Sequence, residues 1–129
     1  MKKIITLLSL FISFIGYSQK KSAPLPDGMI KCWAASYEEN KENSQEKLYR
    51  TCDHAFPPSR FRQSIEFSKN GTCKVLQVGE TDAHYIVDCK YTYDKKKKVL
   101  DISDVNGKVK MKIKVISITS ETLKIVFVD

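Results

Sequence analysis

The chain has 129 residues and a formal net charge of +7, from 22 lysines and arginines against 15 aspartates and glutamates. This length is typical of one domain. The positive charge is moderate, and the four lysines at 95–98 lie between two strand patterns, where such a run indicates a solvated turn. We therefore expect no nucleic-acid partner.

The first nineteen residues predict a secretory signal peptide. Lys2 and Lys3 precede an almost wholly apolar run at 4–15, and residues 16–19 supply a small-residue exit. The apolar run is shorter than the roughly 20 residues that a membrane-spanning helix needs. We predict cleavage after Ser18 or Gln19, a periplasmic or extracellular location, and no transmembrane segment after cleavage.

The rest of the chain predicts one β domain. The domain plan is a signal peptide at 1–19, a linker at 20–29 and the domain at 30–129. Apolar and polar residues alternate nearly everywhere, as in residues 108–115, and no long stretch repeats at helical spacing. The predicted strands lie at 30–38, 46–52, 61–68, 72–78, 84–93, 98–103, 108–118 and 121–128.

Two turns predict how neighbouring strands pair. Asn106-Gly107 is a type I′ hairpin signal, which pairs Ile102 with Met111, Leu100 with Ile113 and Asp101 with Lys112. Lys69-Asn70-Gly71 fits a three-residue loop with Gly71 in the left-handed region, which sets Phe67 opposite Cys73 and Ile65 opposite Val75.

The last two strands predict closure into a barrel. The inward parity changes from odd residues at Val115 to even residues at Ile116, so we expect a β-bulge near Ser117. The final strand turns Leu123, Ile125 and Phe127 inward. We expect it to close against the first strand, because it otherwise remains an apolar edge.

The four cysteines predict two disulfides, because an even count in an oxidising compartment indicates paired cysteines. If residues 40–44 turn the first hairpin, Cys32 lies opposite Cys52; if residues 79–83 form a loop, Cys73 lies opposite Cys89. The alternative is a metal site, but the chain has no Cys-x-x-Cys spacing and only two histidines. We predict the bridges Cys32–Cys52 and Cys73–Cys89, and neither a metal nor a cofactor.

The order of these features resembles the lipocalin-like proteins that Gram-negative bacteria export. The resemblance is carried by Trp33 in the first strand, the segments at 65–72, 90–94 and 99–102, and the closing Thr122-Leu123-Lys124-Ile125. It covers nearly all of the mature chain and implies an eight-stranded antiparallel up-and-down barrel. The segments at 33–39 and 56–62 are similar to a functionally uncharacterised subgroup. The resemblance implies no particular ligand.

Aromatic residues and two arginines are the candidate ligand-binding residues. The predicted registers place Trp33, Tyr37, Tyr49, Phe61, Phe67, Tyr85, Tyr91 and Tyr93 in the barrel interior, where they either line a ligand site or fill the core. Arg60 and Arg62 follow the stiff pair Pro57-Pro58 and could clamp an anion at the mouth of the barrel. Alternatively, one arginine stacks across the barrel end and pairs with a carboxylate such as Asp82.

Two functions are consistent with this pattern. The leading hypothesis is a protein that binds a small hydrophobic or amphipathic ligand in or at the mouth of the barrel, through Tyr37, Arg60, Arg62, Tyr85 and Tyr91. The alternative is a protein-binding module, an inhibitor of an exported hydrolase or an envelope accessory protein, that contacts an exported partner through residues 38–47. His54, His84 and Asp82 could suggest an enzyme, but no serine carries an activating motif, so we predict no catalytic residues.

Overall fold

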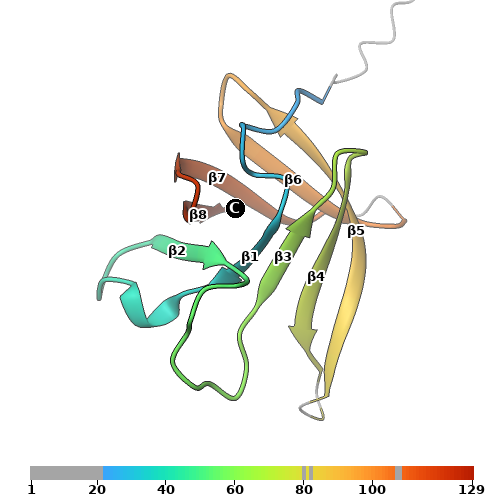
Figure 1. Ribbon diagram of the computed structural model, residues 1–129. Helices are drawn as coiled ribbons and strands as arrows, with labels where there is room; N and C mark the ends of the chain where they lie inside the picture. The colour runs from blue at the N-terminus through green and yellow to red at the C-terminus, as the bar shows by residue number, and fades with distance from the viewer. Residues whose placement is uncertain (1–21, 80, 82, 107–108) are drawn as a thin grey trace, which may run out of the picture.

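The computed structural model describes residues 22–79, 81, 83–106 and 109–129 (Figure 1). The predicted signal peptide and cleavage site therefore lie outside the described residues. The elements are β1 (Cys32–Ala35), the 3₁₀-helix η1 (Tyr37–Glu39), β2 (Glu46–Thr51), β3 (Ser64–Phe67), β4 (Thr72–Val78), β5 (His84–Asp94), β6 (Val99–Asp104), β7 (Val109–Ile118) and β8 (Thr122–Val128). Within these residues no helix is both long and apolar enough to cross a membrane.

The strands form a closed antiparallel barrel, as predicted, in the order β1-β2-β8-β7-β6-β5-β4-β3. The order departs from the simple up-and-down path at one place. The prediction that the last strand closes against the first is wrong, because β8 pairs with β2 and β1 lies between β2 and β3. Residues 52–63 make this possible, since they are long enough to return from the end of β2 to the start of β3.

The predicted registers are confirmed. Leu100 faces Ile113 and Ile102 faces Met111 between β6 and β7. The predicted pairs Phe67–Cys73, Ile65–Val75, Cys73–Cys89 and Trp33–Thr51 are also present. Alternation therefore identified the inward face of every one of these strands, because a shift by one residue would turn each apolar set toward solvent.

The irregular positions are partly as predicted. Gly71 has φ +80°, the left-handed conformation expected for the β3–β4 loop. The register of β7 and β8 shifts between Val115 and Ser117, which confirms the predicted bulge. A second shift between Ile102 and Ser103 was not predicted. Gly107 of the predicted type I′ turn lies outside the described residues.

Side chains fill the barrel interior. Trp33, Leu100 and Ile102 are fully buried, and the indole Nε1 of Trp33 donates to the carbonyl oxygen of Met29 at 3.0 Å. The residual space at the centre of the core is about 10 Å³, no more than one water needs. Of the predicted interior residues, five are buried: Trp33, Tyr49, Phe67, Tyr91 and Tyr93.

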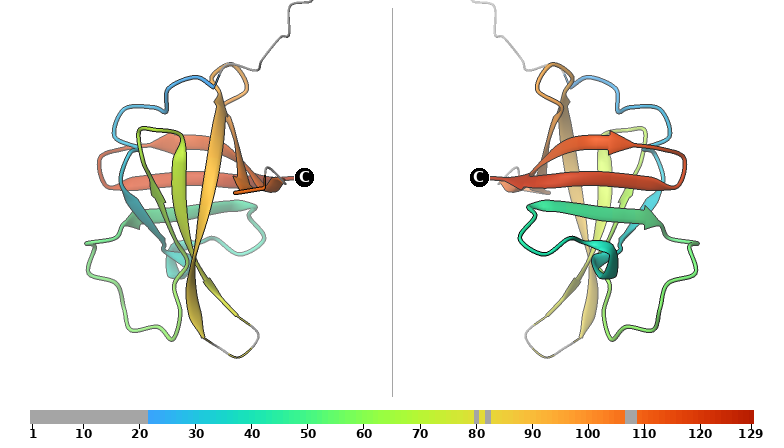
Figure 2. Two further views of the ribbon diagram at one scale, coloured as in Figure 1. Left: turned by 90° about the vertical axis from the view of Figure 1, so that its right-hand side faces the viewer. Right: turned by 90° about the vertical axis from the view of Figure 1, so that its left-hand side faces the viewer.

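One end of the barrel is covered by residues 22–30, and we call it the closed end (Figure 2). We predicted this segment as a linker, but Met29 is fully buried within the core. The backbone N–H of Ala23 donates to the carbonyl of Tyr93 at 2.9 Å, and the Tyr93 N–H donates to Ser22 Oγ at 3.1 Å. Residues 22–29 are therefore part of the packed domain.

The opposite end, which we call the open end, is formed by η1, residues 56–63 and the β4–β5 hairpin. In both side views the hairpin extends beyond the rest of the barrel (Figure 2). The first strand is shorter here than predicted, because the chain turns at Ser36 into η1. Ser36 is buried, and its Oγ donates to Glu39 Oε2 at 2.6 Å.

Candidate functional site

Four of the five predicted ligand-binding residues lie at the open end. Tyr37 belongs to η1, Arg60 and Arg62 to the segment before β3, and Tyr85 to the β4–β5 hairpin. Tyr91 lies near the closed end instead: its ring is buried, its hydroxyl donates to the carbonyl of Ser68 at 2.5 Å, and its ring packs edge-to-face on Phe67. The assignment of Tyr91 to the same site as the others is therefore wrong, because β5 is long enough to separate the two tyrosines.

The side chain of Arg62 contacts two aromatic rings, one carboxylate and two backbone carbonyls. Its guanidinium lies over the rings of Tyr37 and Phe56, at 4.7 and 4.3 Å from their centroids. Its two terminal nitrogens bind both oxygens of Glu38, at 2.5 and 2.8 Å, and donate to the carbonyls of Ala35 and Pro57. We call this arrangement the Arg62 clasp.

The Arg62 clasp is a structural contact. Its donors are already occupied, so Arg62 has little capacity left for a ligand, contrary to the predicted anion-binding role. The alternative of a stacked, carboxylate-paired arginine is what the structure shows, with Glu38 as the partner; Asp82 lies outside the described residues. The hydrogen bond from Arg62 lowers the pKa of Glu38 below its ordinary value.

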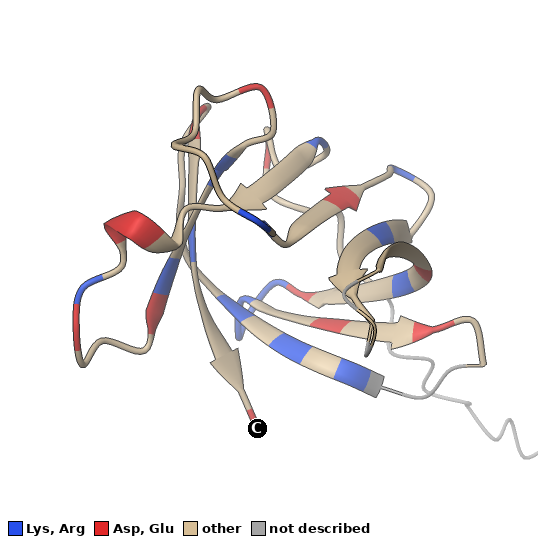
Figure 3. Ribbon diagram, turned by 90° about the horizontal axis from the view of Figure 1, so that it is seen from below, with Lys and Arg blue, Asp and Glu red and all other residues tan. Residues whose placement is uncertain are grey.

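A second ion pair ties η1 to β2. Arg50 Nε and Nη2 bind the two oxygens of Glu39 at 2.6 and 2.8 Å. These bonds, with the one from Ser36, lower the pKa of Glu39 to about 2. Figure 3, seen from below the open end, shows the acidic residues of η1 close to the basic residues of neighbouring segments. The short helix is thus fixed to two parts of the barrel by charge-assisted hydrogen bonds.

Aromatic side chains remain exposed around the open end. Tyr37 and Tyr85 are 45% and 46% exposed, so neither belongs to the interior as predicted. The Tyr37 hydroxyl hydrogen-bonds Ser59 and reaches the carbonyl of Phe61, whose ring contacts that of His84 at 5.1 Å. We call Tyr37, Phe61, His84 and Tyr85 the aromatic rim. These residues lie outside the core because β1 ends early and the hairpin extends past the barrel.

Arg60, two residues before Arg62, differs from it in its contacts. It is exposed and forms no ion pair among the described residues, in contrast to Arg62. An exposed guanidinium at the same end as exposed aromatic rings can bind an anionic group while the rings contact apolar surface. The arrangement suits an amphipathic anion on the surface.

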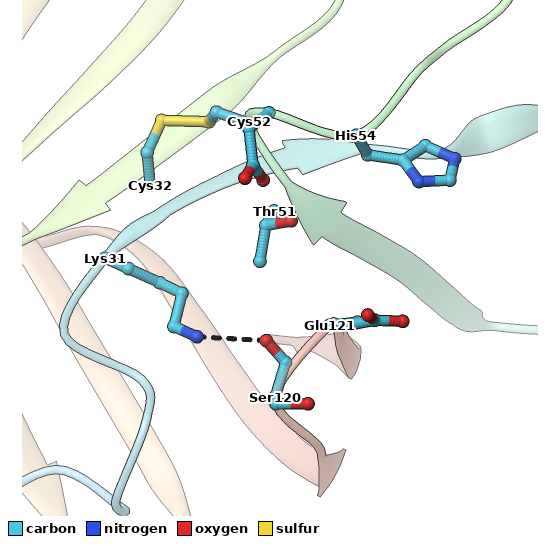
Figure 4. Close-up of a pocket in the computed structure, with 8 residues that line it drawn as sticks. Lys31, Cys32, Thr51, Cys52, His54, Ser120 and Glu121 are labelled. Carbon is cyan, nitrogen blue, oxygen red and sulfur yellow. Dashed lines mark hydrogen bonds between the residues drawn. A yellow bond between two sulfur atoms is a disulfide. The ribbon is translucent and has the colours of Figure 1, made fainter.

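The closed end carries a different site, an open depression of about 710 Å³ beside the Cys32–Cys52 disulfide (Figure 4). Lys31 Nζ donates to the carbonyl of Ser120 at 3.0 Å, and the hydrogen bond from Thr51 lowers the pKa of Asp53. His54 lies on the opposite side from Lys31 and packs on Phe56. The lining residues are Lys31, Cys32, Thr51, Cys52, Asp53, His54, Ser120 and Glu121. Their charges are mixed, and a hydroxyl–carboxylate contact joins Thr51 to Asp53.

The two cysteine pairs differ in their chemistry. Cys32 and Cys52 are bridged, as predicted, on the outer surface. The predicted Cys73–Cys89 bridge is absent: the two residues face each other in register but are free, buried thiols. Burial raises the pKa of Cys73 to about 12 and also raises the pKa of Cys89. Since the thiolate is the species that attacks, burial disfavours oxidation of this pair.

The histidines do not come together. His54 lies beside the closed-end depression, whereas His84 belongs to the aromatic rim. In the described part of the chain, no three His, Cys, Asp or Glu side chains gather into a possible metal site.

Sequence reasoning missed the carboxylates of η1. Ser36-Tyr37-Glu38-Glu39 contains the Ser-x-x-Glu pattern that often marks the start of a helix, and this signal could have identified the turn. The pairing of Glu38 with Arg62 depends on the three-dimensional path of residues 52–63, whereas Glu39 is bound by Arg50 of β2.

Comparisons with known proteins identify no relative. No protein-family description, no curated protein and no solved structure matches this chain.

Proposed function

We propose that this protein is an exported, lipocalin-like barrel that binds an amphipathic anion on the aromatic rim without catalysis. The observation that carries the proposal is that Tyr37 and Tyr85, each nearly half exposed, share the open end with Arg60, which is exposed and forms no ion pair among the described residues. Large aromatic side chains grouped on a surface are typical of binding sites.

The filled interior supports a site at the mouth rather than inside the barrel. The space left in the core is about 10 Å³, whereas pockets for small ligands are typically about 300 Å³ or more. The ion pairs of the Arg62 clasp and of Glu39 with Arg50 hold Tyr37 in place. A fixed ring loses little conformational freedom when a ligand binds.

Export rests on two supports. Residues 1–19 have the order of a signal peptide, and the Cys32–Cys52 disulfide suits an oxidising compartment.

The test is titration with 8-anilinonaphthalene-1-sulfonate, an amphipathic aromatic anion, followed by fluorescence. We expect Y85A to weaken binding about tenfold or more, since removal of a ring that the bound ligand covers costs about 1–3 kcal/mol. R60Q should weaken binding of this anion but not of the neutral N-phenyl-1-naphthylamine. I116A is the matched control, because Ile116 is also exposed but lies on β7. Equal affinity in Y85A, R60Q and the unchanged protein would contradict the proposal.

A second candidate is a protein-binding module. It is favoured by the same ion pairs, because they hold η1 rigid at the start of the exposed segment 38–47. Rigid loops bind protein partners with little ordering cost. Pull-down from the native host should then recover a stoichiometric partner that is lost when residues 40–45 are replaced by glycine and serine.

A further inference from the structure

The β4–β5 hairpin leaves one strand edge unpaired. β6 pairs with β5 only from Cys89 onward, so residues 84–88 of β5 have no partner strand on that side among the described residues. Figures 1 and 2 show this half of β5 extending past the β6–β7 end of the barrel. An unpaired edge of this kind is a template for pairing with another chain.

The hydrogen-bond pattern shows which backbone groups this edge presents. Gly79 N–H donates to the carbonyl of Ala83, and Tyr91 N–H donates to that of Gly71, so the odd-numbered residues of β5 face β4. In an antiparallel ladder the intervening residues point the other way. The N–H and C=O groups of His84, Ile86 and Asp88 therefore point to the free edge.

The composition of this edge lacks the usual protection. Natural sheets blunt exposed edges with lysine, proline or a bulge. Lysine and arginine are frequent in this chain, and they alternate along β7 in Figure 3, yet residues 75–89 contain neither and also contain no proline. Ile86 is the most exposed large apolar residue of the described chain, at 64%.

The edge is complementary to itself. If two copies of β5 pair antiparallel about Ile86, each Ile86 meets Ile86 of the second copy, and His84 lies opposite Asp88. An imidazole N–H then meets a carboxylate twice, once on each side of the two-fold axis. On the other face, Tyr85 lies opposite Val87. His84 and Asp88 are both exposed, and the ring contact of His84 with Phe61 lies at the surface.

We propose that two copies of this protein pair through the free edges of β5, residues 84–88, to form a symmetric dimer with a continuous β4-β5-β5-β4 sheet. The self-complementary order His84-Tyr85-Ile86-Val87-Asp88 identifies a second copy as the occupant. The pairing supplies about six backbone hydrogen bonds and a small apolar contact, which is typical of a weak, concentration-dependent interface.

The test is sedimentation velocity on protein purified from cells that express the full chain, with the Cys32–Cys52 disulfide intact. We expect dimer to form as the concentration rises from about 10 µM to about 1 mM. I86K should weaken dimerisation about tenfold or more, whereas I116K, which changes an exposed isoleucine on β7, should change it less than about twofold. Circular dichroism confirms that each variant is folded.

A charge swap tests the register. H84D places two aspartates opposite each other on both sides of the axis and should weaken the dimer about tenfold. The double variant H84D/D88H has the composition of the unchanged protein and restores complementary pairs, so it should recover dimerisation to within about threefold. A protein that stays monomeric at 1 mM, an I116K variant as impaired as I86K, or a swap that restores nothing would overturn the proposal. None of these outcomes bears on the dye titration of the aromatic rim, which is measured at low protein concentration.

Discussion

The two ends of the barrel are stabilised in different ways. At the closed end, Met29 and Trp33 have no exposed surface, and a disulfide joins β1 to the end of β2. At the open end, partly exposed rings are held by the ion pairs of Glu38 and Glu39. Apolar burial and a covalent bond are not subject to Debye screening by salt, whereas ion pairs near the surface are screened. The comparison indicates a rigid base at one end and a polar, accessible rim at the other.

The largest effect should come from shortening a buried side chain at the closed end. Met29 is fully buried, so M29A removes apolar contacts and leaves a cavity in the core. It should lower the free energy of unfolding by about 2–5 kcal/mol. Y85A, at the open end, should cost less than about 1 kcal/mol because its ring is 46% exposed. Urea unfolding followed by Trp33 fluorescence measures both. Similar losses in the two variants would show that the ends do not differ.

The next effect concerns the bridge at the closed end. Replacing both Cys32 and Cys52 with alanine should lower the free energy of unfolding by about 3 kcal/mol, because the bridge joins two residues that are 20 positions apart in the sequence. A reducing agent should destabilise the unchanged protein by a similar amount and leave this double variant unaffected. The matched control is C73A/C89A, which should remain sensitive to the reducing agent.

The free thiols offer a direct check. Because burial raises the pKa of Cys73 to about 12, iodoacetamide at pH 8 should label the folded protein very slowly. In urea without reducing agent it should label two cysteines, Cys73 and Cys89. Peptide mapping that finds these residues joined would contradict the structure.

The smallest effect is acid sensitivity at the open end. The pKa of Glu39 is lowered from 4.5 to about 2 in the folded protein, so its ion pair contributes fully above pH 4.5 and is lost as the pH falls toward 2. Stability should therefore decline between these values, and E39Q should reduce the decline. E42Q is the control, because Glu42 is exposed and forms no ion pair among the described residues. Unfolding measured at pH 6 and pH 3 in low salt tests this, and equal declines in E39Q and E42Q would count against it.

Much of the barrel could be predicted because the signals are local. Alternation marked Leu123 and Ile125 as inward, and both are buried, but Phe127, also predicted inward, is 44% exposed. The Lys69–Gly71 loop predicted the pairs Phe67–Cys73 and Ile65–Val75, which are confirmed. The change of parity at Ser117 predicted the bulge. Each of these features depends on residues that are close together in the chain.

The candidate site was less predictable because it depends on distant contacts. Tyr37, Arg60, Arg62 and Tyr85 share the open end, but Arg62 is occupied by Glu38, and Tyr91 lies elsewhere. The segment that crosses from β2 to β3 brings Phe56 and Arg62 against η1. Nothing in the local pattern of residues 56–62 indicates which carboxylate they will meet.

By itself, the sequence determined that the chain folds as eight antiparallel strands, the register of the β3–β4, β4–β5 and β6–β7 pairs, and which cysteines lie opposite each other. Only the tertiary structure decided that β8 pairs with β2, that Met29 covers the closed end, that Cys73 and Cys89 remain thiols, and that an edge of β5 is left free. Side-chain period and turn geometry act over a few residues, whereas closure, burial and free edges depend on where the strands end relative to one another.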